Sequence, residues 1–284
     1  MKRVYLLPNI LTAFSLTCGL FVIFKINMIE PGSGNYEVVF TSAIILLIAS
    51  LADFADGALA RVLRAESEFG FEFDTLADAV SFGVAPSVLL LKTLSLEQGT
   101  VLSFFAASGC MIYSLCGILR LVRFNVRSHE AKGNVELMQA QKKHFTGLPI
   151  PASCGAAISA NLIFLSPLTL QWMRVSPLDQ ALILIGVMIF LGYLMVCPLK
   201  FPSLKLLRFK LTFFYLAILT VFSGAVFFYG IRYFFPIVLA LIFWGYIAIA
   251  LFFSLIRAIA GKKSKTLEEF EPDFEDSGDA SSFL

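Results

Sequence analysis

The sequence has few charged residues, and this scarcity argues against an ordinary soluble domain. Only 15% of its 284 residues are charged, whereas 58% are hydrophobic and 14% are aromatic. A typical soluble domain carries about 25% charged residues. The mean hydropathy of +0.83 is correspondingly high. The composition therefore predicts a protein that is embedded in a membrane.

Cysteine is also sparse, and its placement argues against two common structural devices. The five cysteines are scattered through apolar segments, and none belongs to a C-x-x-C pair. Zinc sites and disulfide frameworks would need paired spacings, so we predict neither. We expect the cysteines to be small core residues. They are Cys18, Cys110, Cys116, Cys154 and Cys197.

Two further absences bear on processing and on chemistry. No A-x-A-type cleavage site follows the first apolar run, so we expect that run to be retained as a helix and not removed as a signal peptide. The chain has no Ser-His-Asp or Cys-His arrangement that would supply a protein nucleophile. A covalent intermediate on the protein is therefore not expected.

Long apolar runs are abundant. Each approaches or exceeds the roughly 20 residues that a membrane-spanning helix needs. We predict an all-α, polytopic membrane helix bundle of about eight transmembrane helices. The runs are 8–29, 38–60, 74–96, 100–120, 150–168, 178–198, 211–230 and 234–256.

The basic residues predict the orientation of this bundle. If the N-terminus is cytoplasmic and every run crosses, eighteen of the 22 lysines and arginines fall on the inner side. The four on the outer side are Lys25, Lys92, Arg174 and Arg232. This asymmetry follows the positive-inside rule, so we expect both termini to be cytoplasmic.

Aspartate is rare before residue 264, and it is concentrated in one place. Four of the five aspartates there lie between residues 53 and 78, and the fifth is Asp179. On one helix, Asp53, Asp56, Gly57 and Ala60 fall at i, i+3, i+4 and i+7, which is a single stripe. On the next, Gly70, Asp74 and Asp78 fall at i, i+4 and i+8, again on one face.

A short polar link, residues 62–69, joins these two helices at the cytoplasmic end, so a helical hairpin would bring the four carboxylates together. Clustered carboxylates repel one another unless cations neutralise them. Oxygen ligands suit Mg²⁺ or Mn²⁺, and two ions about 3.5–4 Å apart are a common device for phosphoryl transfer. Solvated or helix-capping acids, or an ion pathway of a transporter, are the alternatives.

The residues of this hairpin carry a family resemblance. The pattern Asp53-x2-Asp56-Gly57-x2-Ala60-Arg61-x8-Gly70-x3-Asp74-x3-Asp78 resembles the signature of the CDP-alcohol phosphotransferases, without a gap or substitution. The resemblance implies metal binding by Asp53, Asp56, Asp74 and Asp78, with Asp78 also the general base. It implies a CDP-lipid site lined by Gly57, Ala60, Arg61 and Gly70. The segment "LPNILT" (7–12) resembles the family's first-helix motif, which adds Asn9 and Thr12 to the donor site.

Three later segments resemble one branch of that family, the membrane-embedded bacterial-type phosphatidylserine synthases. They are 120–125, 144–153 and 194–205, with Cys197 where the branch usually has serine. The resemblance implies CDP-diacylglycerol and L-serine as substrates, with serine bound by Arg120, Arg123 and Asn125. The planar guanidinium of arginine can donate two parallel hydrogen bonds to the carboxylate of a free amino acid. Ordinary positive-inside arginines or lipid-headgroup contacts are the alternative for these residues.

Composition, the charge count and the resemblance together give an expected organisation and location. We predict a catalytic membrane domain over 1–210, two additional C-terminal transmembrane helices over 211–263, and an acidic disordered tail over 264–284. The tail carries seven acids and one lysine. The expected place is the bacterial inner membrane, with the active site facing the cytoplasm, as a homodimer without a nucleic-acid partner.

Three other functions remain open at this point. The first is an enzyme of the same family that accepts glycerol 3-phosphate, inositol phosphate or choline. The second is an ion-coupled membrane transporter that uses the acids as its path. The third is a lipid-binding scaffold without turnover.

Overall fold

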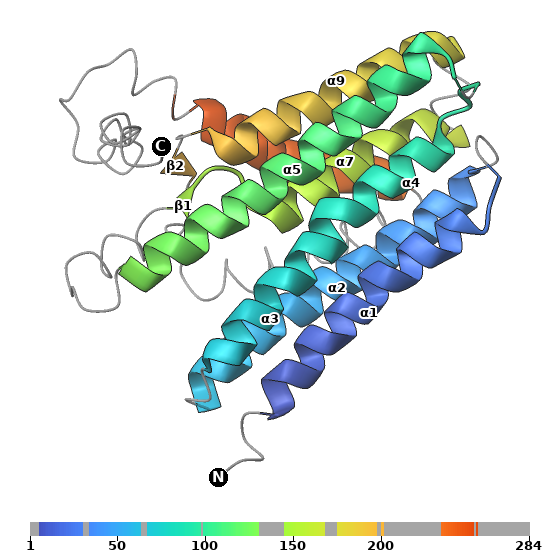
Figure 1. Cartoon of the computed structure of the whole chain (residues 1–284). Helices are drawn as coiled ribbons and strands as arrows, with labels where there is room; N and C mark the ends of the chain where they lie inside the picture. Colours follow the sequence, from blue (N-terminus) through green and yellow to red (C-terminus); the bar gives the residue numbers. More distant parts are fainter. Residues whose placement is uncertain are drawn as a thin grey trace, which may run out of the picture.

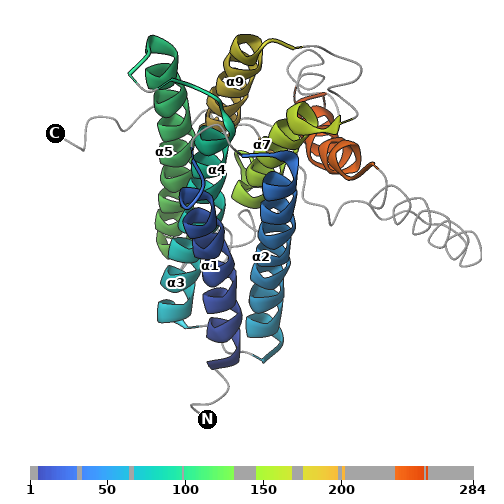
Figure 2. The same cartoon turned by 90° about the vertical axis from the view of Figure 1, so that its right-hand side faces the viewer.

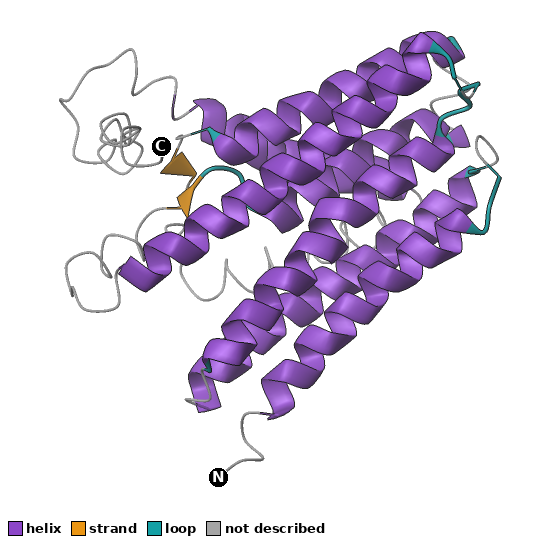
Figure 3. Cartoon of the chain, viewed as in Figure 1, coloured by secondary structure: helices purple, strands orange, loops and turns teal. Residues whose placement is uncertain are grey.

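The chain forms a bundle of antiparallel helices (Figure 1 and Figure 3). The structure is a computed structural model that describes residues 6–30, 34–63, 67–97, 99–130, 145–167, 175–197, 200–201, 234–252 and 254. Its helices are α1 (Leu6–Asn27), α2 (Tyr36–Leu63), α3 (Glu68–Asp78), η1 (Ala79–Val84), α4 (Ala85–Thr93), α5 (Val101–Glu130), α7 (Ile150–Leu165), α9 (Pro177–Val196) and a last helix Phe234–Phe252.

Six helices in the described part of the chain are long and apolar enough to cross a membrane. They confirm six of the predicted runs. The prediction for 150–168 corresponds to α7, which has only 16 residues, and the run 211–230 lies outside the described residues. Helices α3, η1 and α4 together form one 26-residue span, Glu68–Thr93. Helices α1 and α3 begin, and α2 ends, at the same end of the bundle (Figure 1 and Figure 2).

The short helix α7 is an interior element. Every residue from Ser153 to Leu162 is buried, and α7 packs against α2, α4 and α9. A helix that is buried all round has no face that must match the lipid thickness. Its small residues, such as Gly155 and Ala156, allow neighbouring helices to approach closely. This explains why α7 can be shorter than its neighbours.

The only β-structure in the described ranges is a two-residue antiparallel pairing. Strand β1 (Phe145–Thr146) pairs with β2 (Lys200–Phe201). Next to it, Gly147 adopts a φ of +80°, and a side chain there would run into the Met195 carbonyl oxygen. The Leu148 N–H then donates to the Leu194 carbonyl at 3.0 Å. These contacts satisfy the irregular backbone between β1 and α7 against the end of α9.

The turn that follows Asp78 is a π-helix, η1, in which the Ala85 N–H donates to the Val80 carbonyl. Pro86 lacks an N–H, so it cannot donate to the Phe82 carbonyl four residues earlier. The Tyr113 hydroxyl of α5 donates to that carbonyl instead, at 3.2 Å. The Ser114 hydroxyl donates to the Gly83 carbonyl at 2.9 Å. Two α5 side chains therefore supply donors to the π-helical segment.

We expect Tyr113→Phe to destabilise the bundle. Tyr113 is fully buried, and its loss would leave the Phe82 carbonyl without this donor, at a cost of about 1–3 kcal/mol. The measurement is thermal unfolding of the protein in detergent. Tyr193→Phe is the control, because the Tyr193 side chain is 64% exposed on α9. Equal melting temperatures for the two variants would mean that η1 does not depend on the Tyr113 hydroxyl.

Candidate active site

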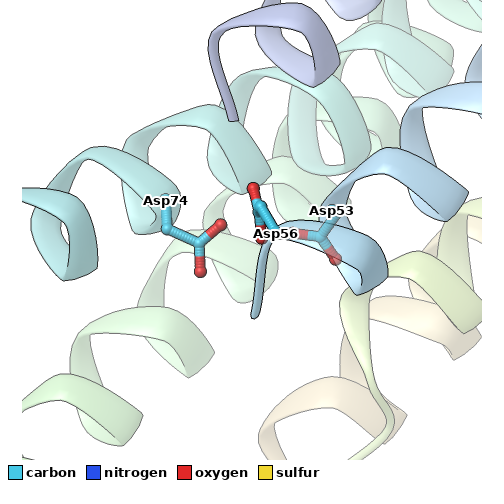
Figure 4. A group of neighbouring side chains, drawn as sticks. All are labelled: Asp53, Asp56 and Asp74. Carbon is cyan, nitrogen blue, oxygen red and sulfur yellow. The ribbon is translucent and has the colours of Figure 1, made fainter. Parts of the chain in front are cut away.

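Three aspartates from two helices converge on one point. Asp53 and Asp56 project from α2, and Asp74 projects from α3 (Figure 4). One carboxylate oxygen from each lies within 4.8 Å of the others. Asp56 is only 4% exposed, and Asp53 and Asp74 are half-buried, so the group is partly enclosed by the bundle. The hairpin predicted from the aspartate spacing therefore brings these three residues together.

The fourth aspartate, Asp78, is the last residue of α3 and lies beside this group. Its carboxyl is within hydrogen-bonding reach of the Asp53 carboxyl, and Asp74 is its electrostatic neighbour. Among the described residues, the Oδ1 atoms of Asp74 and Asp78 are buried and have no hydrogen-bond partner. Buried carboxylate oxygens without donors are costly, and a bound cation would satisfy them. The four side chains therefore fit a site for a divalent metal.

Helix α1 closes one side of the aspartate group. The Thr12 hydroxyl donates to Asp56 Oδ2 at 2.6 Å, and it is 3.2 Å from the Pro8 carbonyl oxygen. One turn away, Asn9 lies over Gly70, because a side chain at Gly70 would meet Asn9 Oδ1 at 2.9 Å. The absence of a side chain at Gly70 thus allows α1 to approach α3. Asn9 and Thr12, the two α1 residues predicted to line the CDP-lipid site, therefore both lie next to the hairpin.

The α2 stripe beside the aspartates is open. A Cβ atom added at Gly57 would meet nothing within 4 Å among the described atoms. Ala60 is half-buried and Arg61 is exposed at the end of the helix. The stripe therefore combines an unfilled space, a small residue and a cation next to the carboxylates, as an elongated phosphorylated ligand would require.

The three residues predicted to bind serine are placed differently. Arg120 of α5 has Asp78 as an electrostatic neighbour. Its Nε is buried, and no described residue accepts a hydrogen bond from it. Of the three, Arg120 is the one whose neighbours include a member of the aspartate group.

Arg123 and Asn125 have partners on other helices. Arg123 Nη1 donates to the Val196 carbonyl at 3.1 Å, which caps the C-terminus of α9. The Asn125 amide donates to the Thr75 hydroxyl at 3.1 Å and contacts Glu72 Oε2 at 3.4 Å. These contacts connect α5 to α9 and to α3, and they do not include Asp53, Asp56, Asp74 or Asp78.

Sequence reasoning assigned no role to Tyr246, an electrostatic neighbour of Arg120. It lies on the last helix, for which the sequence suggested no role. The sequence feature that could have identified it is its polar hydroxyl on an otherwise apolar stripe of the helix. That stripe contains Phe235, Leu239, Phe243, Tyr246 and Ala250, spaced by four, four, three and four residues.

Two comparisons with known proteins agree with this geometry. Residues 5–194 match the family model described as CDP-alcohol phosphatidyltransferase. This match contains every helix that contributes an aspartate to the group. It also contains α1 and α5, which carry Thr12 and Arg120.

Similar proteins from three organisms carry the name CDP-diacylglycerol–serine O-phosphatidyltransferase. The one from Helicobacter pylori strain J99 is 30% identical over 245 residues, which cover 81% of this chain and 92% of the relative. The one from Bacillus subtilis is 31% identical over 199 residues, covering 70% and 91%. The one from Methanocaldococcus jannaschii is 31% identical over 178 residues, covering 63% and 72%.

Proposed function

The chain belongs to the CDP-alcohol phosphatidyltransferase family, and on that premise we propose that it transfers the phosphatidyl group of CDP-diacylglycerol to the hydroxyl of L-serine. The products are phosphatidylserine and CMP. The observation that carries this proposal is the convergence of Asp53, Asp56 and Asp74 inside a membrane helix bundle. The names of the similar proteins support serine as the acceptor.

The metal part of the proposal rests on the aspartate group. Asp53, Asp56, Asp74 and Asp78 would hold two divalent ions, Mg²⁺ or Mn²⁺, which prefer carboxylate oxygen ligands. When bound, such ions neutralise the carboxylates and stabilise charge on phosphate oxygens. The buried, unpartnered oxygens of Asp74 and Asp78 support this assignment.

The donor would lie along the open stripe of α2. Its CDP portion needs the unfilled space at Gly57 and the small side chain of Ala60. Arg61 would meet its phosphates, since a guanidinium binds phosphate oxygens with a planar fork. The nucleotide end of the donor would be lined by Gly70, Asn9 and Thr12. The acyl chains would remain in the bilayer, between the helices.

The acceptor would enter from the side of Arg120, which would bind the serine carboxylate. Arg123 and Asn125 would border this side and hold α5 against α9 and α3. Asp78 would take the proton from the serine hydroxyl as that oxygen forms its bond to the lipid-linked phosphorus. The bond from this phosphorus to the bridging pyrophosphate oxygen breaks, and CMP leaves. The proton on Asp78 is then released to solvent, which restores the carboxylate.

The arrangement in the membrane is part of the proposal. Both termini would be cytoplasmic, with eight spans, and the active site would face the cytoplasm of a bacterial inner membrane. The excess of lysine and arginine on that side supports this orientation. Residues 1–210 would form the catalytic domain, 211–263 two further spans, and 264–284 an acidic tail. We expect a homodimer.

The test is CMP release by purified protein in detergent with CDP-diacylglycerol and Mg²⁺ or Mn²⁺. L-Serine, glycerol 3-phosphate, inositol phosphate and choline are supplied in separate reactions. Release with serine alone, and its loss in EDTA, is the expected result. Release with another acceptor would contradict serine as the substrate. Folded protein that releases no CMP with any acceptor would favour a transporter or a lipid-binding scaffold.

We expect Arg120→Lys to raise the KM for serine about tenfold or more while the KM for CDP-diacylglycerol changes little. Lysine keeps the charge but cannot form the bidentate contact of a guanidinium with a carboxylate. Steady-state kinetics with each substrate varied in turn provide the measurement. Arg61→Lys is the matched control, because it should raise the KM of the donor instead. Equal effects of Arg120→Lys on both substrates would indicate a general electrostatic role.

A further inference from the structure

Helix α1 presents a stripe of small and polar residues to the helices that carry the aspartate group. Asn9, Thr12, Ser15 and Gly19 are spaced by three, three and four residues, which places them on one face of the helix. Thr12 and Ser15 are only 3% and 2% exposed. Helix α1 packs along α2 and also contacts α3 and η1. This face of α1 therefore lies between the helices that contribute the carboxylates.

Two close contacts hold α1 against α3 and η1. Near the start of α1, Asn9 lies over Gly70, where an added Cβ atom would be 2.9 Å from Asn9 Oδ1. Further along α1, the Ser81 hydroxyl of η1 donates to the Ser15 carbonyl at 3.2 Å. Thr12 is midway between Asn9 and Ser15 in the sequence, so the backbone that carries it is held on both sides.

The Thr12 hydroxyl has one proton and two acceptors within reach. It is 2.6 Å from Asp56 Oδ2 and 3.2 Å from the Pro8 carbonyl oxygen. A distance of 2.6 Å is typical of a hydroxyl that donates to an ionised carboxylate, and such bonds are stronger than those between neutral groups. The Pro8 carbonyl does not need the hydroxyl, because in an α-helix it accepts from the backbone N–H four residues later. The proton is therefore committed to Asp56.

This hydrogen bond constrains the Asp56 carboxylate. It occupies one lone pair on Oδ2 and fixes the rotation of the carboxyl group. The remaining lone pairs can serve a cation in the group formed with Asp53 and Asp74, whose ligand oxygens lie within 4.8 Å of one another. Asp56 is 4% exposed, so water has little access to take the place of the hydroxyl. Carboxylates that bind metals are commonly oriented by such hydrogen bonds.

We propose that Thr12 is a positioning residue for the metal site, which orients the Asp56 carboxylate toward the cation through its hydroxyl. This inference rests on the proposed function and extends the metal site to α1, a helix that supplies no carboxylate to it. The family resemblance places Thr12 in the donor site. Thr12 can still line that site, but its proton is not available to the nucleotide.

The test measures Mn²⁺ binding to the purified protein in detergent, without donor or acceptor, by electron paramagnetic resonance. Thr12→Val keeps the shape of the side chain but removes the hydroxyl, so it should weaken Mn²⁺ binding by about tenfold to a hundredfold. Thr12→Ser keeps the hydroxyl and should bind Mn²⁺ within about threefold of wild type, since the hydrogen bond to the metal ligand is retained. If the valine variant does not fold, Thr12→Ala is measured with the same expected loss.

Thr17→Val is the matched control. Thr17 is exposed on the same helix, and its hydroxyl donates to the Ala13 carbonyl at 2.7 Å, four residues earlier. This substitution removes a hydroxyl from α1 without touching the aspartate group, so Mn²⁺ binding should stay at the wild-type level. Equal losses in Thr17→Val and Thr12→Val would indicate a general effect on α1 and would overturn the role of Thr12.

The binding measurement separates this inference from the proposed function, because it needs no turnover. Wild-type protein that binds Mn²⁺ but releases no CMP with serine would contradict the proposed function alone. Thr12→Val protein that binds Mn²⁺ as tightly as wild type would overturn the role of Thr12, as would a loss that Thr12→Ser shares. Unchanged Mn²⁺ binding together with weaker binding of CDP-diacylglycerol would assign the hydroxyl to the donor instead. Wild-type protein that binds no Mn²⁺ would overturn both the metal site and this inference.

Discussion

Asp78→Asn is expected to lower the kcat for CMP release by about a hundredfold or more, because general-base catalysis contributes about 10²–10⁴ in rate. Asparagine has nearly the same size but cannot take the proton from the serine hydroxyl. Asp78 lies beside Asp53 at the end of α3, so the loss should fall on turnover. Binding of CDP-diacylglycerol, measured by titration of the purified protein in detergent, should be largely retained.

The control for Asp78→Asn is Asp179→Asn in the first turn of α9, where the carboxylate bonds to the Ser176 hydroxyl at 2.8 Å. That variant should keep wild-type activity. In EDTA, Asp78→Asn should be at least as stable as wild type, because one of four repelling carboxylates has been removed. A folded Asp78→Asn protein that no longer binds the CDP-lipid would show that Asp78 acts mainly as a metal ligand.

Gly57→Leu is expected to abolish measurable CMP release without destabilising the protein. The first atom of the new side chain meets nothing within 4 Å, so leucine can be accommodated when no donor is bound. Leucine also favours a helix over glycine by up to about 1 kcal/mol. The same side chain would fill the space assigned to the CDP portion of the donor. Binding of CDP-diacylglycerol should therefore be lost, while the melting temperature stays the same or rises.

Gly186→Leu is the matched control, because Gly186 of α9 is also a helical glycine with nothing within 4 Å of an added side chain. It should keep wild-type activity and gain similar helix stability. If Gly57→Leu also keeps wild-type activity, the donor does not lie along the α2 stripe. If both variants lose activity, the effect is a general response of membrane helices to added bulk.

The helices and the aspartate group could be predicted from the sequence because both follow from local patterns. Apolar runs near 20 residues identify membrane helices by length alone. The aspartates repeat at helical spacing on two consecutive runs, so a hairpin must bring them together. The predicted link, 62–69, overlaps both of the helices that it joins. Helix α2 continues to Leu63, and Ser67 caps α3 by accepting a hydrogen bond from the Gly70 N–H at 3.0 Å.

Partners that belong to distant helices could not be predicted from the sequence. Arg120 and Arg123 are three residues apart on one helix, which suggested a shared ligand. The structure turns Arg123 to the end of α9 and Arg120 to Asp78. Their separation depends on how α5 packs between its neighbours, and no local pattern encodes that packing.

The length of α7 illustrates a different limit. The run 150–168 resembles its neighbours in hydropathy, but its helix has only 16 residues. Its richness in small residues reflects burial on all sides, and a helix enclosed by other helices need not match the bilayer. Hydropathy measures how apolar a segment is and does not distinguish contact with lipid from contact with protein.

The π-helical turn η1 has a consequence for insertions and deletions in this chain. Each residue of an α-helix advances the direction of the side chains by about 100°. Deleting one residue from η1 would make Glu68–Thr93 a regular helix and rotate α4 by about that angle relative to α3. Ser87, which now donates to the Cys110 carbonyl at 3.1 Å, would turn away from α5. The extra residue of η1 therefore changes the direction of the side chains along this span. Asp74 and Asp78 before it face the aspartate group, whereas the α4 side chains after it face the bundle core.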